Sequence, residues 1–156
     1  MLLDVNTKRG QKSLAFEKEM LKRIEYNFSV QLIETNKKTD AKVDGIIVKD
    51  NQLSGIFESK CRNMNFMEFN NYGSWLVTFD KIMDGKKISQ MFRVPFFGFL
   101  YLIPDKIIYY WKITDEIGEF KFRFEVNKTT TQKTINGGKA VRTNAYLPIK
   151  YANEIT

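Results

Sequence analysis

The sequence predicts a single α/β domain in which a mixed, largely antiparallel sheet is flanked by helices and extended by a polar C-terminal β-ribbon. Three observations lead to this prediction. The 156 residues suffice for one hydrophobic core but not for a separate recognition domain. The N-terminal part has the period of an amphipathic helix, and later parts alternate short apolar runs with turn signals. We therefore treat residues 1–156 as one domain.

The composition limits the chemistry that this domain can perform. Its single cysteine excludes an intramolecular disulfide, and the absence of histidine excludes histidine-based catalytic triads and zinc sites that contain histidine. Carboxylates and lysines remain as the candidate catalytic groups. The sequence starts without a signal-peptide pattern and has no apolar run of membrane-spanning length, so we expect a soluble, cytoplasmic protein.

The first element is a predicted helix from Gln11 to about Phe28. At about 100° per residue, its apolar residues form one stripe: Leu14, Met20, Leu21, Ile24 and Phe28. Glu17 falls in the middle of this stripe, whereas Glu19 falls on the opposite, solvated side. A buried carboxylate is costly without a partner, which a neighbouring metal site would supply. Alternatively, the stripe is wider than the true contact and Glu17 reaches its rim.

A β-hairpin is predicted next. A short strand at Val30–Glu34 and a polar loop at Thr35–Asp40 precede two strongly apolar runs, Val43–Val48 and Leu53–Cys61. The pair Asp50-Asn51 between these runs is a tight-turn signal. The two runs are therefore expected to pair as antiparallel strands.

Charged residues interrupt this apolar hairpin at Asp44, Glu58 and Lys60. Alternate residues of a strand share a face, so Glu58 and Lys60 are expected to emerge side by side. The other face would carry Phe57, Ser59 and Cys61. The register decides whether Asp44 lies across from Glu58 or from Lys60. Two carboxylates beside an amine suit a Mg²⁺ site for phosphodiester chemistry, and a salt bridge at the end of a hairpin is the other interpretation.

The stretch from Gly10 to Arg62 resembles the PD-(D/E)xK nuclease superfamily, in which an acidic residue opens one core strand and a Glu-x-Lys closes the next. Asp44 and Glu58-Ser59-Lys60 carry the match, while Val43 replaces the proline that names the motif. The order of a helix with a Gly and a Glu, then Asp, then Glu-x-Lys looks most like the small Holliday-junction resolvases. The resemblance implies a restriction-endonuclease-like fold.

The resemblance also implies a function and a set of site residues. Mg²⁺, or Mn²⁺ in its place, would be held by Asp44, Glu58 and the carbonyl of Ser59. Lys60 would position the attacking water, and Glu17 would support the cluster, since superfamily members often carry a glutamate on the first helix. The expected activity is endonucleolytic hydrolysis of nucleic acid, with DNA favoured and branched DNA as one candidate. A symmetric homodimer would favour a resolvase.

Two alternatives stay open at the level of sequence. The first is a nucleic-acid-binding or inhibitory protein that has the same fold but no turnover. The second is a β-rich protein-interaction module in which the Glu-x-Lys is accidental. Binding of Mg²⁺ or Mn²⁺ separates the second alternative from the others, because such a module has no specific metal site.

The middle of the chain is predicted to be mainly helical. Asn63 is the expected N-cap of a helix through Phe69. Residues Trp75–Met83 fit either a helix face or a strand, and we favour the helix, followed by a break at Asp84-Gly85 and a second helical piece to Val94. The lysines of this region are predicted to lie on a solvated face: Lys81, Lys86 and Lys87.

Strands are predicted for most of the remaining chain. Phe96–Ile103 and Lys106–Ile113 are the most apolar runs and should form a buried hairpin. Phe120–Val126 alternates aromatic with mainly basic residues, which is typical of a strand with one wet face. The polar segment Asn127–Pro148, with a turn signal at Asn136–Gly138, is expected to form a two-stranded ribbon.

Positive charge is concentrated in this last third of the chain. The net charge is +7, and residues 121–150 carry seven basic residues against one acidic residue. Basic, amide and hydroxyl groups are the usual contacts to phosphate and sugar. The predicted nucleic-acid-binding residues are Lys121, Arg123, Lys133, Lys139 and Arg142. The alternative is an ordinary exposed hairpin whose polarity protects its edges.

Overall fold

The computed structural model describes residues 8–36, 41–133 and 139–155. Within them, six strands form a main sheet in the order β1-β2-β3-β5-β6-β9, and three form a second sheet in the order β4-β8-β7. The main-sheet strands are β1 (Gln31–Glu34), β2 (Gly45–Lys49), β3 (Gln52–Arg62), β5 (Phe96–Leu102), β6 (Ile107–Thr114) and β9 (Asn153–Ile155). The second sheet contains β4 (Ser74–Thr78), β7 (Glu125–Lys133) and β8 (Lys139–Pro148).

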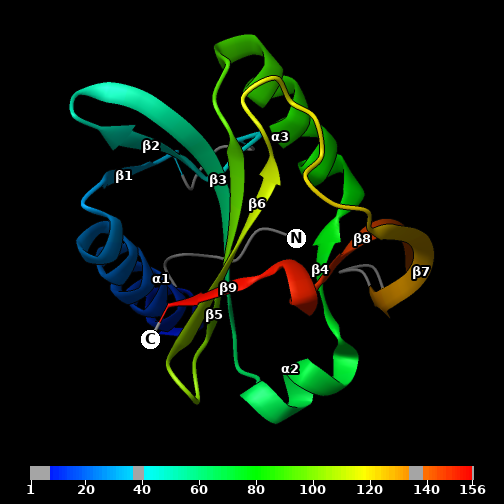
Figure 1. The fold of residues 1–156 in the computed structure, drawn as a ribbon. Helices are drawn as coiled ribbons and strands as arrows, with labels where there is room; N and C mark the ends of the chain where they lie inside the picture. Colours follow the sequence, from blue (N-terminus) through cyan, green and yellow to red (C-terminus); the bar gives the residue numbers. More distant parts are fainter. Residues whose placement is uncertain (1–7, 37–40, 134–138, 156) are drawn as a thin grey trace.

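The described helices are α1 (Lys8–Phe28), α2 (Phe66–Tyr72), α3 (Phe79–Phe92) and the short 3₁₀ helix η1 (Ile149–Tyr151). None of them is both long and apolar enough to cross a membrane. Figure 1 shows α1 and α3 on opposite sides of the main sheet. Each side has its own core: Met20, Leu21 and Ile24 of α1 pack on one face, and Ile82 of α3 packs on the other.

The predicted β2–β3 hairpin is confirmed. The two strands pair antiparallel, with Gly45 opposite Phe57. Asp50 and Asn51 both have positive φ angles, of 52° and 62°, as the two central residues of a type I′ hairpin turn do. On its other edge β3 pairs in parallel with β5, while every other adjacent pair in the main sheet is antiparallel. The sheet is therefore mixed and largely antiparallel, consistent with a restriction-endonuclease-like fold.

The prediction of a helix over Trp75–Met83 is wrong for its first part. Residues Ser74–Thr78 form β4, and α3 begins at Phe79. Trp75 and Val77 are buried while Leu76 is exposed, and β4 pairs with β8 far along the chain. This pairing with a distant strand overrides the local helical pattern.

The predicted break at Asp84-Gly85 is also wrong, because α3 continues to Phe92. A Cβ atom at Gly85 would lie 2.2 Å from Cε2 of Phe96, a residue that is fully buried. The glycine therefore serves close packing of the helix on β5 and does not mark a turn.

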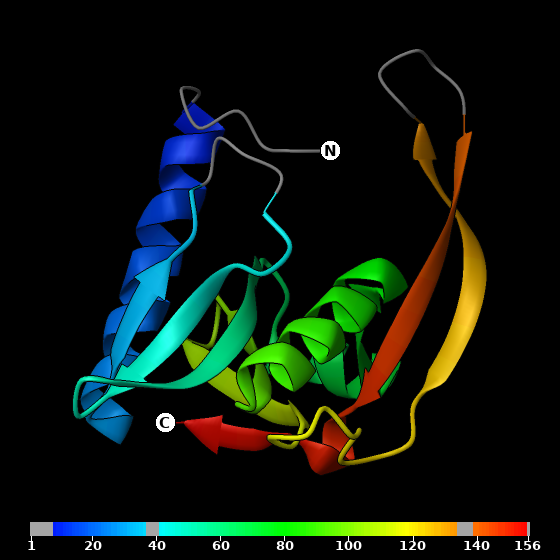
Figure 2. The same ribbon diagram turned by 90° about the horizontal axis from the view of Figure 1, so that it is seen from above.

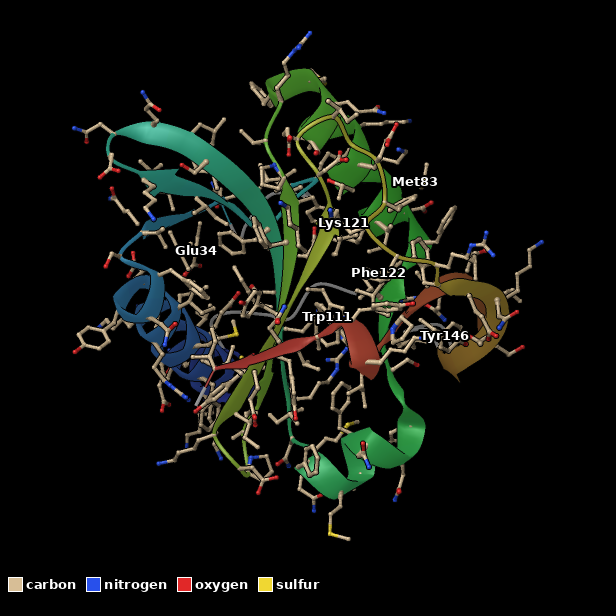
Figure 3. All side chains as sticks on the ribbon, in the orientation of Figure 1. Glu34, Met83, Trp111, Lys121, Phe122 and Tyr146 are labelled. Atoms are coloured by element: carbon tan, nitrogen blue, oxygen red, sulfur yellow. The ribbon has the colours of Figure 1, made fainter. Side chains whose placement is uncertain are left out.

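The start of α2 and the segment before β7 also differ from the predictions. The N-cap of α2 is Asn65, not Asn63, and its Oδ1 accepts a hydrogen bond from the N–H of Glu68. The segment Phe120–Val126 is not a strand, since only an isolated bridge joins Phe120 to Thr114 and β7 starts at Glu125. Its aromatic residues Phe120, Phe122 and Phe124 pack on the α3-side core. Figure 3 shows Lys121 and Phe122 on this segment.

The polar ribbon is confirmed as two antiparallel strands, β7 and β8. Figure 2 shows this pair extending beyond the body of the molecule, on the side away from α1. The turn predicted at Asn136–Gly138 and most of the polar loop predicted at Thr35–Asp40 lie outside the described residues. The base of the ribbon is fixed, because β8 also pairs with β4.

Candidate active site

Strand β3 divides its side chains between the two faces of the main sheet. Phe57 and Cys61 pack in the core that α1 covers, whereas Ile56 packs in the core on the α3 side. By the alternation of a strand, Glu58 and Lys60 lie on the α3 face with Ile56. Glu58 and Lys60 therefore share one face of the sheet, and Phe57 and Cys61 lie on the other face, as predicted.

Asp44 lies directly against β3, just before β2 begins. Its backbone N–H donates to the carbonyl of Phe57 at 3.0 Å, and its Oδ2 accepts from the N–H of Ser59 at 2.8 Å. The β2–β3 ladder ends at Gly45, so the N–H of Ser59 binds the Asp44 carboxylate instead of a backbone carbonyl of β2. The carbonyl of Ser59 points to this same side of β3, because the N–H and C=O of an extended residue share a side.

Glu58 is a buried carboxyl group with an unsatisfied oxygen. Its side chain is 5% exposed, and Oε1 has no hydrogen-bond partner among the described residues. The pKa of Glu58 is raised to about 9, mainly by burial and in addition by the charge and hydrogen bonding of Asp44. Lys81 and Lys60 oppose this rise only in part. A cation at this position would satisfy Oε1 and favour the ionised carboxylate.

Two lysines stand beside the carboxyl groups. Lys60 is exposed near the end of β3, but partial desolvation of its ammonium group lowers its pKa. The charge of the neighbouring Arg62 lowers this pKa further, while Asp44 and Glu58 act against both. Lys81, in the first turn of α3, is close enough to act on Glu58 and Lys60. The site therefore presents two carboxyl groups and two ammonium groups on one side of the sheet.

The prediction that Lys81 lies on a solvated face is wrong. Lys81 is half-buried and near Glu58 because β4 ends at Thr78, so that α3 begins at Phe79, two residues before this lysine. Choosing the strand interpretation for the segment at Trp75 would have predicted a later start of the helix and a place for Lys81 near the site. Lys86 is also not solvated, since Nζ donates to the carbonyl of Gly118 and lies over the ring of Phe120. Lys87 is exposed, as predicted.

Glu17 reaches the same strand from the opposite face of the sheet. Its Oε1 accepts a hydrogen bond from Oγ of Ser59 at 3.3 Å, so α1 is rotated as predicted, with Glu17 toward β3. The contact places Glu17 beside the residue whose N–H binds Asp44, rather than beside Glu58 itself. Glu19 is exposed but is not simply solvated, since Oε1 accepts from the hydroxyl of Tyr101, whose long side chain reaches the helix from β5.

The donors at this site suit a hard divalent cation. Within the residues that the structure describes, no group of three or more Asp, Glu or Cys side chains is close enough to form a metal site alone. Mg²⁺ usually keeps several waters and needs only one or two carboxylates together with substrate phosphate. The Asp44 carboxylate, the unsatisfied Glu58 oxygen and the Ser59 carbonyl provide a set of this kind.

The predicted nucleic-acid-binding residues lie outside this cluster. Lys121 and Arg123 are exposed on the segment before β7, where they line a cavity with Phe79, and Arg142 is exposed on β8. Lys133 and Lys139 occupy paired positions of the ribbon, and their side chains lie outside the described part of the structure. Their role in binding stays a prediction.

The fold and the site together define a class of protein. A mixed sheet with helices on both faces, an acidic residue before one core strand and Glu-x-Lys on the next are the features of a PD-(D/E)xK protein. A family model described as "Phage putative PDDEXK endonuclease" matches residues 7–119, and the chain belongs to this family. The match contains Glu17, Asp44, Glu58 and Lys60, and it ends before β7. Neither the curated proteins nor the solved structures gave a significant match.

Proposed function

We propose that this protein is a divalent-metal-dependent endonuclease that hydrolyses phosphodiester bonds in DNA. The single observation that carries the proposal is the unsatisfied, buried Oε1 of Glu58 beside Asp44. A buried carboxyl group with an unsatisfied oxygen destabilises a fold, so its presence indicates a function that needs it. Membership of a PDDEXK endonuclease family supports the same conclusion.

Mg²⁺, with Mn²⁺ as a substitute, is the proposed cofactor. Asp44 and Glu58 would hold it, together with the carbonyl of Ser59. The ion would supply Lewis-acid activation of the phosphodiester and of water. The N–H of Ser59 orients the Asp44 carboxylate toward this position through the 2.8 Å hydrogen bond.

The lysines would act on charge and on protons. Lys60, on the same face as Glu58, would orient the attacking water and neutralise charge that develops on the phosphoryl group. Its lowered pKa brings the exchange of a proton at Nζ closer to neutral pH. Lys81 would add a second positive charge near the same phosphate. Glu17 would be a positioning residue that acts through Ser59.

The choice of a nucleic acid as substrate follows from charge, and DNA is the form that we favour. The net charge of +7 and the exposed Lys121, Arg123 and Arg142 favour a long polyanion, which would be held mainly through its phosphates. Branched DNA is the finer candidate, and a symmetric dimer in solution would favour it over nicking of linear DNA.

A cleavage panel tests the proposal. Single-stranded, duplex, flapped and four-way DNA are incubated with the protein in Mg²⁺, in Mn²⁺ and in EDTA. We expect cleavage only with a divalent ion, and a loss of about 1,000-fold in Asp44→Asn, because weakening a metal ligand removes several kcal/mol of transition-state stabilisation. Asp50→Asn, an exposed turn residue, is the matched control and should cleave normally. Cleavage in EDTA, or full activity of Asp44→Asn, would refute the proposal, and binding without cleavage would favour the non-catalytic alternative.

A further inference from the structure

A cavity of about 390 Å³ lies where β3 and β5 meet α2 and the second sheet, a volume within the range of small-molecule sites. Its lining includes Arg62 of β3, Leu100 of β5, Tyr72 of α2 and Tyr146 of β8. Figure 3 shows Tyr146 on the second sheet. β4, which contributes Trp75 and Leu76, is an edge strand of that sheet. The cavity thus lies at a sheet edge, and four of its nine lining residues are aromatic.

The strand register places this cavity directly beside the candidate active site. In the parallel pairing of β3 with β5, Glu58 lies next to Gly98 and Lys60 lies next to Leu100. Leu100 lines the cavity. Neighbouring strands are about 4.8 Å apart, and two residues span about 7 Å along a strand, so the cavity lies roughly two nucleotides of duplex rise from Glu58.

Trp75 connects the two places. Its ring lies over Gly98, where an added Cβ would be 2.7 Å from Cζ3, so only glycine allows this approach. Trp75 is 3% exposed, yet its Nε1 has no hydrogen-bond partner among the described residues. Among those residues, only Oε1 of Glu58 shares this property, and both Glu58 and Trp75 neighbour Gly98. A buried N–H without a partner is uncommon and indicates a missing acceptor.

The charge and the aromatic groups define the occupant. Arg62 follows Lys60 on the same face of β3, and no described carboxylate acts on its guanidinium. It is therefore available to a phosphate. Tyr72, which is 71% exposed, and Tyr146 offer rings on which a planar group can stack. A cation beside aromatic rings suits a nucleotide whose base is free to leave the helix.

We propose that this cavity, defined by Arg62, Tyr72, Trp75 and Tyr146, binds one unpaired nucleobase of the substrate strand about two nucleotides from the cleaved bond. A paired base cannot enter, because its face is covered by its neighbours in the stack. The site would therefore select DNA with an unpaired nucleotide, such as a flap or a junction, over continuous duplex. This inference rests on the proposed nuclease function and adds the structural feature that the enzyme would recognise.

An abasic scan combined with a variant tests the inference. Affinity of the wild-type protein in EDTA is measured by fluorescence anisotropy on a flapped DNA in which each unpaired nucleotide is made abasic in turn. Loss of a stacked base should weaken binding by about 10-fold at one position only. Tyr72→Ala should lose about 10-fold on the intact flap and become insensitive to the abasic position. Tyr26→Ala, on a side chain of α1 that is 90% exposed, is the matched control and should behave as the wild type.

The same DNAs separate this inference from the proposed function. Equal losses at every abasic position, or the same position dependence in Tyr72→Ala, would overturn the base pocket even if Mn²⁺-dependent cleavage is observed. Position-specific loss that disappears in Tyr72→Ala supports the pocket even if no DNA is cleaved, in which case the nuclease function fails alone. Arg62→Gln should in addition flatten the salt dependence of binding by about 0.7 in the log-log slope for a single-strand contact.

Discussion

The two faces of β3 differ in how their polar groups are satisfied. On the α1 face, the Ser59 hydroxyl donates a hydrogen bond to Glu17, and its neighbours Phe57 and Cys61 pack in the core. On the α3 face, Glu58 is equally buried but keeps an oxygen without a described partner. Two consecutive residues of one strand thus differ: the polar side chain of Ser59 is hydrogen-bonded, whereas that of Glu58 keeps an unsatisfied oxygen. The first face is built for stability, whereas the second retains an unfavourable arrangement that a ligand can relieve.

The largest expected effect is that of Glu58→Gln on cleavage. The amide keeps the shape but is a poor ligand for a hard cation, so turnover should fall by about 1,000-fold.

The same variant should change how stability depends on pH. The folded-state pKa of Glu58, about 9, lies above the ordinary value of 4.5, so the folded protein holds a proton that the unfolded chain releases between these values. Wild-type stability therefore falls as pH rises from about 4.5 to about 9, and Glu58→Gln removes this fall.

Thermal unfolding of the metal-free proteins checks the second half of this prediction. At pH 8 the variant should melt about 5 °C higher than the wild type, which corresponds to about 2 kcal/mol, and the gap should shrink toward pH 5. Phe57→Ala, on the other face, is the control, since it should destabilise by about 3–5 kcal/mol at any pH. A lower melting temperature for Glu58→Gln would mean that this carboxyl group stabilises the fold.

The next effect concerns Lys60, which we propose to act on charge in the transition state. Lys60→Met should lower the single-turnover cleavage rate by about 100-fold at saturating protein, with little change in DNA affinity. Lys81→Met provides a comparison within the same cluster. If Lys60→Met instead weakens affinity at an unchanged saturating rate, Lys60 is a phosphate anchor.

A smaller effect on cleavage is expected from the residues on the α1 face of β3. Glu17→Ala removes the acceptor of the Ser59 hydroxyl, and loss of such a supporting contact typically costs about 10-fold in activity. Ser59→Ala should cost the same, and the double variant no more, whereas Glu17→Gln keeps an acceptor oxygen and should restore activity. Glu19→Ala should leave cleavage unchanged. Additive losses in the double variant would show that Glu17 acts by another route.

The smallest effects belong to the basic residues away from the site. Neutralising Lys121, Arg123 and Arg142 one at a time should each flatten the log-log salt dependence of duplex binding by about 0.9. Saturating cleavage rates should stay near the wild type. An unchanged slope in all three variants would assign this surface to solvent or to a protein partner.

Local sequence signals were sufficient for the hairpin and for part of the site. The Asp50-Asn51 turn fixes β2 against β3, so Asp44 and Glu58 come together through contacts close in sequence. The helical period of the first element was enough to predict that Glu17 faces β3. These are short-range consequences of turn chemistry and periodicity.

The remaining features depend on contacts between distant segments. β4 exists because Trp75 and Val77 pair with β8 some seventy residues later, and no local pattern encodes that partner. Once β4 is known, α3 starts at Phe79 and carries Lys81 to Glu58. The burial of Glu58 and the cavity beside Lys60 require both sheets to be in place, so sequence reasoning could not anticipate either one.

Titration calorimetry with Mn²⁺ on the metal-free protein tests the central claim most directly, namely that Asp44 and Glu58 form a divalent-metal site. Because Glu58 is protonated at pH 7.5 in the free protein, binding should release about one proton, which is measured by repeating the titration in two buffers of different ionisation enthalpy. The wild type should bind one Mn²⁺ with this release, and Glu58→Gln should not bind. Equal binding by the wild type and Glu58→Gln, or no specific binding by the wild type, would contradict the account.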